Sequence, residues 1–171
     1  MKSVQRQAGL TLIELMVAVL IVSILMAVGA NSYSRWTQNQ QVRVAAESIL
    51  NGMQLARAEA VKRNGSVRLV LGDLSSWSII EATGGAILQT RTSAEGSNNA
   101  TVTATPGGAT TVTFSSLGRV TTNSDGSAAL SQVDIDNPSG DRPLRITVSA
   151  GGNARMCDPS PKLAAGDPRA C

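Results

Sequence analysis

The sequence predicts an α+β protein, in which a long N-terminal helix with a membrane half and an amphipathic half packs on an antiparallel two-sheet β domain. Three observations predict this fold class. A nearly uncharged apolar run covers residues 10–30, a helical spacing of apolar residues continues to about residue 64, and an alternation of period two begins after Gly65. A helical part followed by several strands is the element order of an α+β fold.

The N-terminal segment is basic at first and then strongly apolar. Residues 1–9 contain Lys2 and Arg6 but no acid, and residues 10–30 carry a single charge, Glu14. A helix of the apolar length extends about 30 Å, which matches the hydrocarbon core of a bilayer. Because positive residues stay on the cytoplasmic side, we expect the rest of the chain to lie outside the inner membrane.

Glu14 separates the interpretations of the apolar run. A secretory signal cleaved after residues 28–30, or a plain membrane anchor, leaves a charge in the hydrocarbon unexplained. One local explanation is a capping box, in which Thr11 and Glu14 bond each other's backbone amides. Another applies if the chain is cut after Gly9, since Leu10 then carries a charged amine close to Glu14 in the sequence. Opposite charges attract strongly at low dielectric, within one chain or between neighbouring chains.

The helical spacing continues beyond the apolar run, over residues 31–64. Apolar residues recur there at intervals of three and four, at Val42, Ala45, Ile49, Met53, Ala56 and Ala60. Polar and charged residues occupy the other faces, which is the pattern of an amphipathic helix with a modest apolar stripe. Asn64 and Gly65 form a helix-stopping pair, so we expect the helix to end there.

Short alternating runs follow Gly65 and are separated by turn-forming residues. Their apolar members are Val67, Leu69 and Leu71; Trp77 and Ile79; Val102 and Ala104; Val112 and Phe114; Val133 and Ile135; and Leu144, Ile146 and Val148. Such runs predict antiparallel strands, and we expect the apolar stripe of the helix to complete the core against a sheet. The polar stretch 93–109 is expected to be a loop with one weak strand.

No residue pattern in the sequence indicates catalysis. The chain contains no histidine, which removes the commonest general base and the commonest metal ligand. The nucleophile-elbow and phosphate-loop motifs are absent, and the serines and threonines have no base to activate them. Asp134, Asp136 and Asp141 lack the spacing of a calcium loop and are better explained as strand and turn carboxylates. We therefore expect no enzyme activity, no metal and no cofactor.

Cys157 and Cys171 are the two cysteines of the chain, and both lie near its end. In an exported protein an even pair favours a disulfide, and the alternative is two unrelated thiols. The bond would close a loop of about 15 residues and stabilise the fold by roughly 3 kcal/mol on a chain-entropy estimate.

Residues 9–15 (Gly-Leu-Thr-Leu-Ile-Glu-Leu) resemble the class III signal of type IV prepilins and type II secretion pseudopilins. The resemblance implies that a prepilin peptidase cuts after Gly9 and N-methylates Leu10. It also implies that Glu14 offsets the N-terminal charge of a neighbouring subunit during assembly. Phenylalanine is usual at the first mature position, where this chain has leucine, but the site mainly requires the preceding glycine.

The remainder of the chain resembles the GspH/FimT branch of the pilin superfamily, which includes H-type pseudopilins and the minor pilins FimT and FimU. The resemblance is carried by the segments Ala56–Ala60, Phe114–Arg119, Cys157–Pro159 and Gly166–Cys171. It implies a minor pilin or pseudopilin subunit of a type IV pilus or a type II secretion system. The implied partners are other pilin or pseudopilin subunits, prepilin peptidase and the inner membrane.

These inferences divide the chain into four segments. They are a leader peptide (1–9), a transmembrane and assembly helix (10–30), its amphipathic continuation (31–64), and a periplasmic β domain with a disulfide-closed tail (65–171). The protein is then a single-pass inner-membrane protein that enters a filament or pseudopilus on assembly. The open alternative is a periplasmic domain released by signal peptidase, with Asn31 as its first residue.

A second alternative is that the protein captures DNA for natural transformation. Some FimT-like proteins bind DNA through a Gly-Arg-x-Arg motif, and the matching stretch here keeps Arg155 but has Asn153 in place of the first arginine. Further positive charge nearby comes from Arg145, Lys162 and Arg169. Phosphate binding requires several cations that face one strand, and acidic neighbours offset much of this charge. A solvated surface with scattered charge is therefore the competing explanation.

Overall fold

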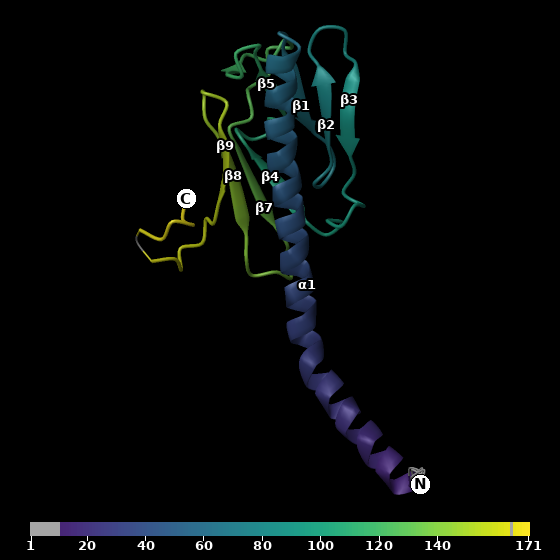
Figure 1. Ribbon diagram of the computed structural model, residues 1–171. Helices are drawn as coiled ribbons and strands as arrows, with labels where there is room; N and C mark the ends of the chain where they lie inside the picture. Colours follow the sequence, from purple (N-terminus) through teal and green to yellow (C-terminus); the bar gives the residue numbers. More distant parts are fainter. Residues whose placement is uncertain (1–10, 165) are drawn as a thin grey trace, which may run out of the picture. The chain divides into compact units, whose positions relative to one another are not determined.

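The computed structural model describes residues 11–164 and 166–171, which form two compact units that meet between Ser34 and Arg35 (Figure 1). The first unit holds the beginning of the helix, and the second holds the rest of the helix and both sheets. Gly9 and Leu10, the expected cleavage and methylation positions, lie outside the described residues.

One helix, α1 (Leu12–Lys62), contains both helical segments that the sequence predicts. The hydroxyl oxygen of Thr11 caps its first turn by accepting the backbone N–H of Glu14 at 3.3 Å. At its other end Asn64 adopts a positive φ of 49°, and the N–H of Gly65 donates to the carbonyl of Ala60 at 3.1 Å. This is a Schellman ending, and it confirms the stop expected at Asn64 and Gly65.

The first unit presents apolar side chains on every side of its helix. From Leu12 to Met26 the large apolar residues are all exposed within the chain. Among the described residues, no single straight helix is long and apolar enough to cross a bilayer. Two stretches of α1, Leu12–Ala27 and Ser32–Lys62, could do so together as a bent pair, by length and composition.

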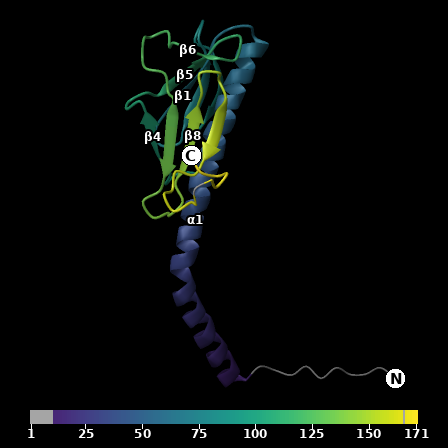
Figure 2. The same ribbon diagram turned by 90° about the vertical axis from the view of Figure 1, so that its left-hand side faces the viewer.

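The second unit contains two antiparallel sheets. The first has the order β3-β2-β1-β5-β6, with β1 (Val67–Leu71), β2 (Trp77–Glu81), β3 (Ile87–Arg91), β5 (Thr111–Phe114) and β6 (Val120–Thr121). The second has the order β4-β7-β8-β9, with β4 (Thr101–Thr105), β7 (Gln132–Asp136), β8 (Leu144–Val148) and β9 (Ala154–Cys157). Figure 2 shows the second sheet with the C-terminal tail leaving its edge strand β9.

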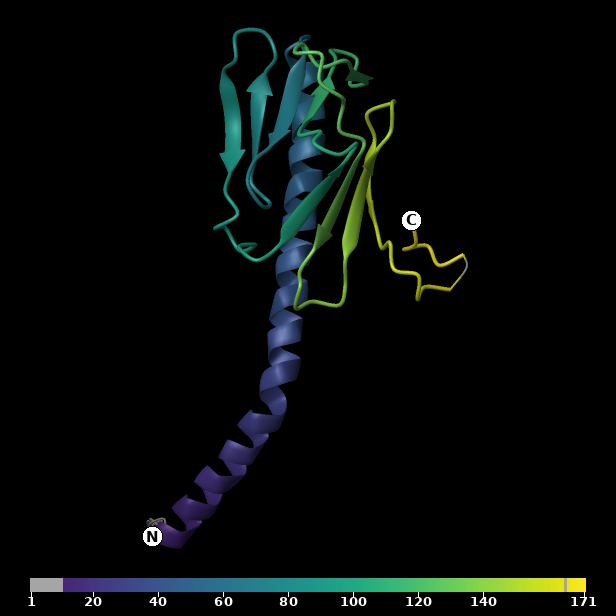
Figure 3. The ribbon, with the colours of Figure 1, turned by 180° about the vertical axis from the view of Figure 1, so that it is seen from behind.

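A single core joins the helix to both sheets, because the second half of α1 lies along one face of each (Figures 1 and 3). The helix contributes its predicted stripe of Val42, Ala45, Ile49, Met53, Ala56 and Ala60, all buried. The first sheet contributes Val67, Leu69, Ile79, Val112 and Phe114, and the second contributes Val133, Ile135 and Ile146. The predicted α+β fold class, with a long helix on two antiparallel sheets, is confirmed.

The alternating runs of the sequence all form strands, but three further strands had not been predicted. These are β3, β6 and β9. The stretch 93–109 contains the single expected strand, β4. The run Leu144–Val148 alternates most regularly in sequence, yet only Ile146 of its residues is fully buried.

Candidate functional site

Glu14 lies in the first turn of α1 and is exposed among apolar side chains. Its backbone N–H reaches the Thr11 hydroxyl, which is one half of the capping box. Within the described residues the Glu14 carboxylate itself has no hydrogen bond and no ion pair, so the reciprocal half of the box does not form. A carboxylate without a partner on an apolar helix needs a counter-charge from outside the described chain if it is buried.

The apolar surface around Glu14 is not covered by any other part of the chain that the structure describes. Soluble proteins rarely expose a continuous apolar surface of this kind, which marks a membrane or protein contact. Ser23 lies on this surface, and its hydroxyl donates to the backbone carbonyl of Val19 at 2.8 Å. The Ser23 hydroxyl proton is therefore already used within the helix. The segment is therefore suited to lipid or to the packing of other apolar helices.

Three segments of the second unit meet at the end of the domain where α1 stops. The Arg57 guanidinium donates through Nε to the Gly118 carbonyl at 2.9 Å and through Nη1 to the Asn153 Oδ1 at 2.8 Å. A Cβ added to Gly152 would lie 1.9 Å from the Gly118 oxygen, so only glycine fits between the two turns. We call Arg57, Gly118, Gly152 and Asn153 the distal clamp, since they tie the helix to a turn of each sheet.

The clamp involves two of the segments on which the family resemblance rests, together with one further turn. Ala56–Ala60 supplies the arginine, Phe114–Arg119 supplies the turn between β5 and β6, and Gly152 and Asn153 lie in the turn between β8 and β9. Asn153, which stands where some relatives have an arginine, is the acceptor for Arg57. A cation at this position would face another cation, so the asparagine fits the clamp.

A groove of about 620 Å³ lies beside the distal clamp, and we call it the distal groove. It is lined by Gln54, Arg57, Ala58, Val61, Lys62, Gly152, Asn153 and Ala154. Lys62 also bonds Glu59 at 3.1 Å, and Arg63 bonds the same carboxylate at 2.8 Å. Hydrogen bonds from Arg63 and then Lys62 lower the pKa of Glu59 below its ordinary value.

At the opposite end of the domain, amide side chains of α1 hold the loop between β7 and β8. Gln38 accepts from the Asn137 amide at 2.8 Å, and Asn39 donates to Asp141 at 2.7 Å. Asp134 pairs with Arg145, so two of the three carboxylates weighed for calcium already have side-chain partners. No group of three or more ligand-type side chains is placed to hold a metal in the described part of the chain.

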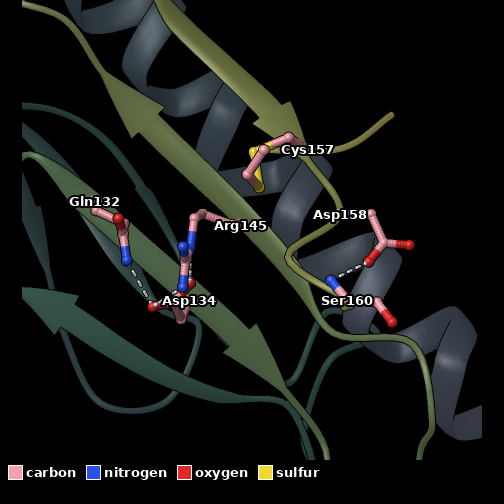
Figure 4. The surroundings of a disulfide bond; sticks show 7 residues. Gln132, Asp134, Arg145, Cys157, Asp158 and Ser160 are labelled. Carbon is pink, nitrogen blue, oxygen red and sulfur yellow. Dashed lines mark hydrogen bonds and ion pairs between the residues drawn. A yellow bond between two sulfur atoms is a disulfide. The ribbon is translucent and has the colours of Figure 1, made fainter. Parts of the chain in front are cut away.

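The predicted disulfide between Cys157 and Cys171 is present, with a Cα–Cα distance of 5.1 Å (Figure 4). It returns the end of the chain to the last residue of β9. The tail is also tied to itself, since Asp158 donates its N–H to the Arg169 carbonyl at 2.7 Å and accepts from the Cys171 N–H at 3.2 Å. The closed tail therefore has a defined conformation at the edge of the second sheet.

Two of the four cations considered for DNA are held by carboxylates. Arg145 on β8 contacts both oxygens of Asp134 on β7, at 2.5 and 3.2 Å (Figure 4). Arg169 contacts both oxygens of Asp167, at 3.1 and 2.8 Å. Hydrogen bonding from Arg169 lowers the pKa of Asp167 to about 2.

The other two cations, Arg155 and Lys162, are exposed and have no ion pair among the described residues. The register of β8 and β9 places Arg155 opposite Thr147 and Arg145 opposite Cys157, on the same face of the sheet. The structure therefore gathers these residues at one edge of the domain but leaves two free charges there rather than four.

Two family models match the sequence of this chain. The model of the family "Type II transport protein GspH" matches residues 45–152, and the prokaryotic N-terminal methylation motif matches residues 4–30. No curated protein sequence matches the chain.

Two crystal structures of the type IV minor pilin FimU of Pseudomonas aeruginosa are similar to the fold. They share 20% identity with this chain, at TM-scores of 0.54 and 0.51. The matches cover 71% and 67% of this chain and 91% and 90% of the FimU chains. The likeness shows a common pilin-like fold.

Proposed function

The chain belongs to the GspH family of pilin-like type II transport proteins, and from this premise we propose that it is a minor pilin or pseudopilin subunit that assembles through its N-terminal helix. The observation that carries the proposal is the Glu14 carboxylate, which has no partner in the described chain and lies on an apolar surface under the N-terminal methylation motif.

Processing supplies the missing counter-charge in this proposal. Prepilin peptidase cuts after Gly9, removes the leader 1–9 and methylates the new amine of Leu10. The charged amine of one subunit then pairs with Glu14 of its neighbour while the apolar helices pack. At roughly 4 Å and an effective dielectric constant near 20 such a pair attracts by about 4 kcal/mol, enough to select one axial register.

The same proposal assigns compartments. Residues 10–30 lie in the inner membrane before assembly, with Lys2 and Arg6 on the cytoplasmic side. The amphipathic continuation 31–64 and the β domain 65–171 lie in the periplasm. The disulfide supports this location, because such bonds persist in oxidising compartments and are rare in the cytosol.

The decisive variant is Glu14→Leu, compared with the wild type in the native cells. We expect its recovery in sheared filaments or pseudopili to fall about tenfold or more, since each 1.4 kcal/mol of lost attraction is about a tenfold effect. Glu47→Gln is the matched control, because Glu47 is on the same helix but pairs with Arg43 on the surface. Normal incorporation of the Glu14→Leu protein would refute the proposed assembly role.

The mature N-terminus separates this proposal from release by signal peptidase. Intact-mass and N-terminal analysis of the mature protein should show an N-methylated Leu10, whereas signal-peptidase release would leave Asn31 as the first residue. DNA capture is not proposed, because the structure leaves Arg155 and Lys162 as two unpaired cations at the tail edge, and phosphate binding draws on several.

A further inference from the structure

We propose that the distal groove, together with the neighbouring Leu117, is a docking surface for an acidic peptide segment with an apolar anchor, contributed by an adjacent pilin-like subunit. The inference rests on the proposed function, because it takes the partner to be another subunit of the same assembly. The surface lies wholly within the second unit, at the end of the domain where α1 stops.

The surface has an apolar component that the domain does not use in its own core. Leu117 is 80% exposed and Val61 is 52% exposed. Val61 lies beside Gly118, the residue that follows Leu117, because a Cβ added to Gly118 would lie 3.2 Å from Val61 Cγ2. Ala58 and Ala154 extend the apolar surface into the groove. An isolated exposed leucine needs no explanation, but exposed apolar side chains that line a groove are the form of an anchor site, and Val61 is one of them.

The polar part of the surface offers donors and positive charge. The Nη2 of Arg57 has no acceptor among the described residues, and Asn153 has committed its oxygen to Arg57, which leaves its amide N–H groups available. Lys62 lines the groove, and the exposed Arg119 follows Gly118. The nearest carboxylate on the helix, Glu59, is already bonded by Lys62 and Arg63. A carboxylate-bearing segment therefore complements the groove better than a basic one.

A neighbouring subunit is the partner that such a small surface can hold. The groove is smaller than a stable protein interface requires, so by itself it binds weakly. Subunits anchored by helices in one membrane or filament, however, present their domains to each other at high effective concentration. The distal clamp keeps the two turns of the groove in place, so little ordering accompanies docking. The charge then selects which subunit binds.

The test is photo-crosslinking of the full chain in its own cells. The variant Leu117→p-benzoylphenylalanine should yield an adduct with another pilin-like subunit, mapped by mass spectrometry to an acidic segment. The matched variant Ile87→p-benzoylphenylalanine, at an equally open apolar position (66% exposed) on β3, should yield none. Adding Lys62→Glu and Arg119→Glu should reduce the Leu117 adduct about tenfold, because like charges then oppose the partner.

A third crosslinker at Val19, in the apolar helix, separates failure of this inference from failure of the proposed function. A subunit adduct from Val19 but none from Leu117 would overturn the docking surface and leave the subunit assignment intact. No subunit adduct from either position would overturn both. A Leu117 adduct with a basic segment, or with a protein that is not a pilin-like subunit, would overturn the inference. An adduct that survives the two charge reversals would also overturn it.

Discussion

The two units of the molecule differ in whether their side chains find partners and cover within the described chain. In the second unit, buried polar side chains find partners within the chain, such as Trp77 with Ser48 at 2.8 Å and Thr113 with Asn123 at 2.8 Å. In the described residues, Arg68 Nε is the single buried side-chain nitrogen or oxygen atom that has no hydrogen-bond partner. In the first unit the large apolar side chains from Leu12 to Met26 are exposed, and the Glu14 carboxylate has no partner among the described residues.

The globular unit covers its own apolar side chains, whereas the apolar helix needs cover from lipid or from other protein chains. Hydrophobic burial within the chain acts only on the second unit, so its stability should depend on its core, its disulfide and its clamp. Substitutions in the apolar helix of the first unit should change assembly and leave the free energy of unfolding of the second unit unchanged.

The largest effect should come from Phe114→Ala. Phe114 is fully buried against both the helix and the first sheet, and its truncation should lower the free energy of unfolding by about 3–5 kcal/mol through lost burial and a cavity. Urea unfolding of the full chain in detergent, followed by tryptophan fluorescence, measures the change. Trp77 is a suitable probe because it is buried in the same core.

Leu20→Ala is the matched control for the core substitution. Leu20 is 59% exposed within the chain, so this variant should have the unfolding midpoint of the wild type. A shift as large as that of Phe114→Ala would break the comparison, because it would mean that the apolar helix also stabilises the domain.

Loss of the disulfide should have the next largest effect on the domain. Cys157→Ser combined with Cys171→Ser should reduce the free energy of unfolding by roughly 3 kcal/mol, as closure of a loop of this length predicts. The helical signal of the folded protein, measured by far-ultraviolet circular dichroism in detergent, should not change. An equal unfolding midpoint for the oxidised wild type and the double variant would contradict this role of the bond.

Sequence alone predicted the parts of the fold that repeat a simple pattern. The helical stripe and the alternating runs predict the buried faces, and Asn64 and Gly65 predict the end of α1. Strands β3 and β9 were not predicted, and each of them pairs on only one side. β3 leaves Ile87 exposed, and β9 is only four residues long. Edge strands need less burial, so their alternation is weak.

The candidate site divides in the same way. Glu14 could be singled out from sequence because one charge interrupts an apolar run, and the cysteine pair because no other partner exists. The distal clamp could not be predicted, since Arg57 lies 61 residues from Gly118 and 96 residues from Asn153. Only the packing of two sheets on one helix brings these three residues together.

Arg57→Ala should show that the clamp stabilises the domain. The variant removes two hydrogen bonds and leaves the partly buried Gly118 carbonyl without its donor, so we expect a loss of about 1–3 kcal/mol. Arg43→Ala is the matched control, because it breaks an exposed ion pair with Glu47 and should cost about 0.5 kcal/mol or less. Equal unfolding midpoints for these two variants would show that the clamp is no stronger than a surface pair.

The smallest effect concerns Asp167, whose pKa of about 2 is below its ordinary value of 3.8 because of the bonds from Arg169. A carboxyl whose pKa is lower in the folded state stabilises that state above its unfolded pKa, and this contribution is lost as the pH falls through the folded pKa. The contribution should therefore be complete well above pH 3.8 and be lost as the pH falls from there through about 2. In the Arg169→Ala variant, the pKa of Asp167 measured by NMR titration should return toward 3.8. A pKa that stays near 2 would exclude Arg169 as the cause of the shift. Asp167 thus has a charged partner even at the surface of the domain, which Glu14 lacks among the described residues of its own chain.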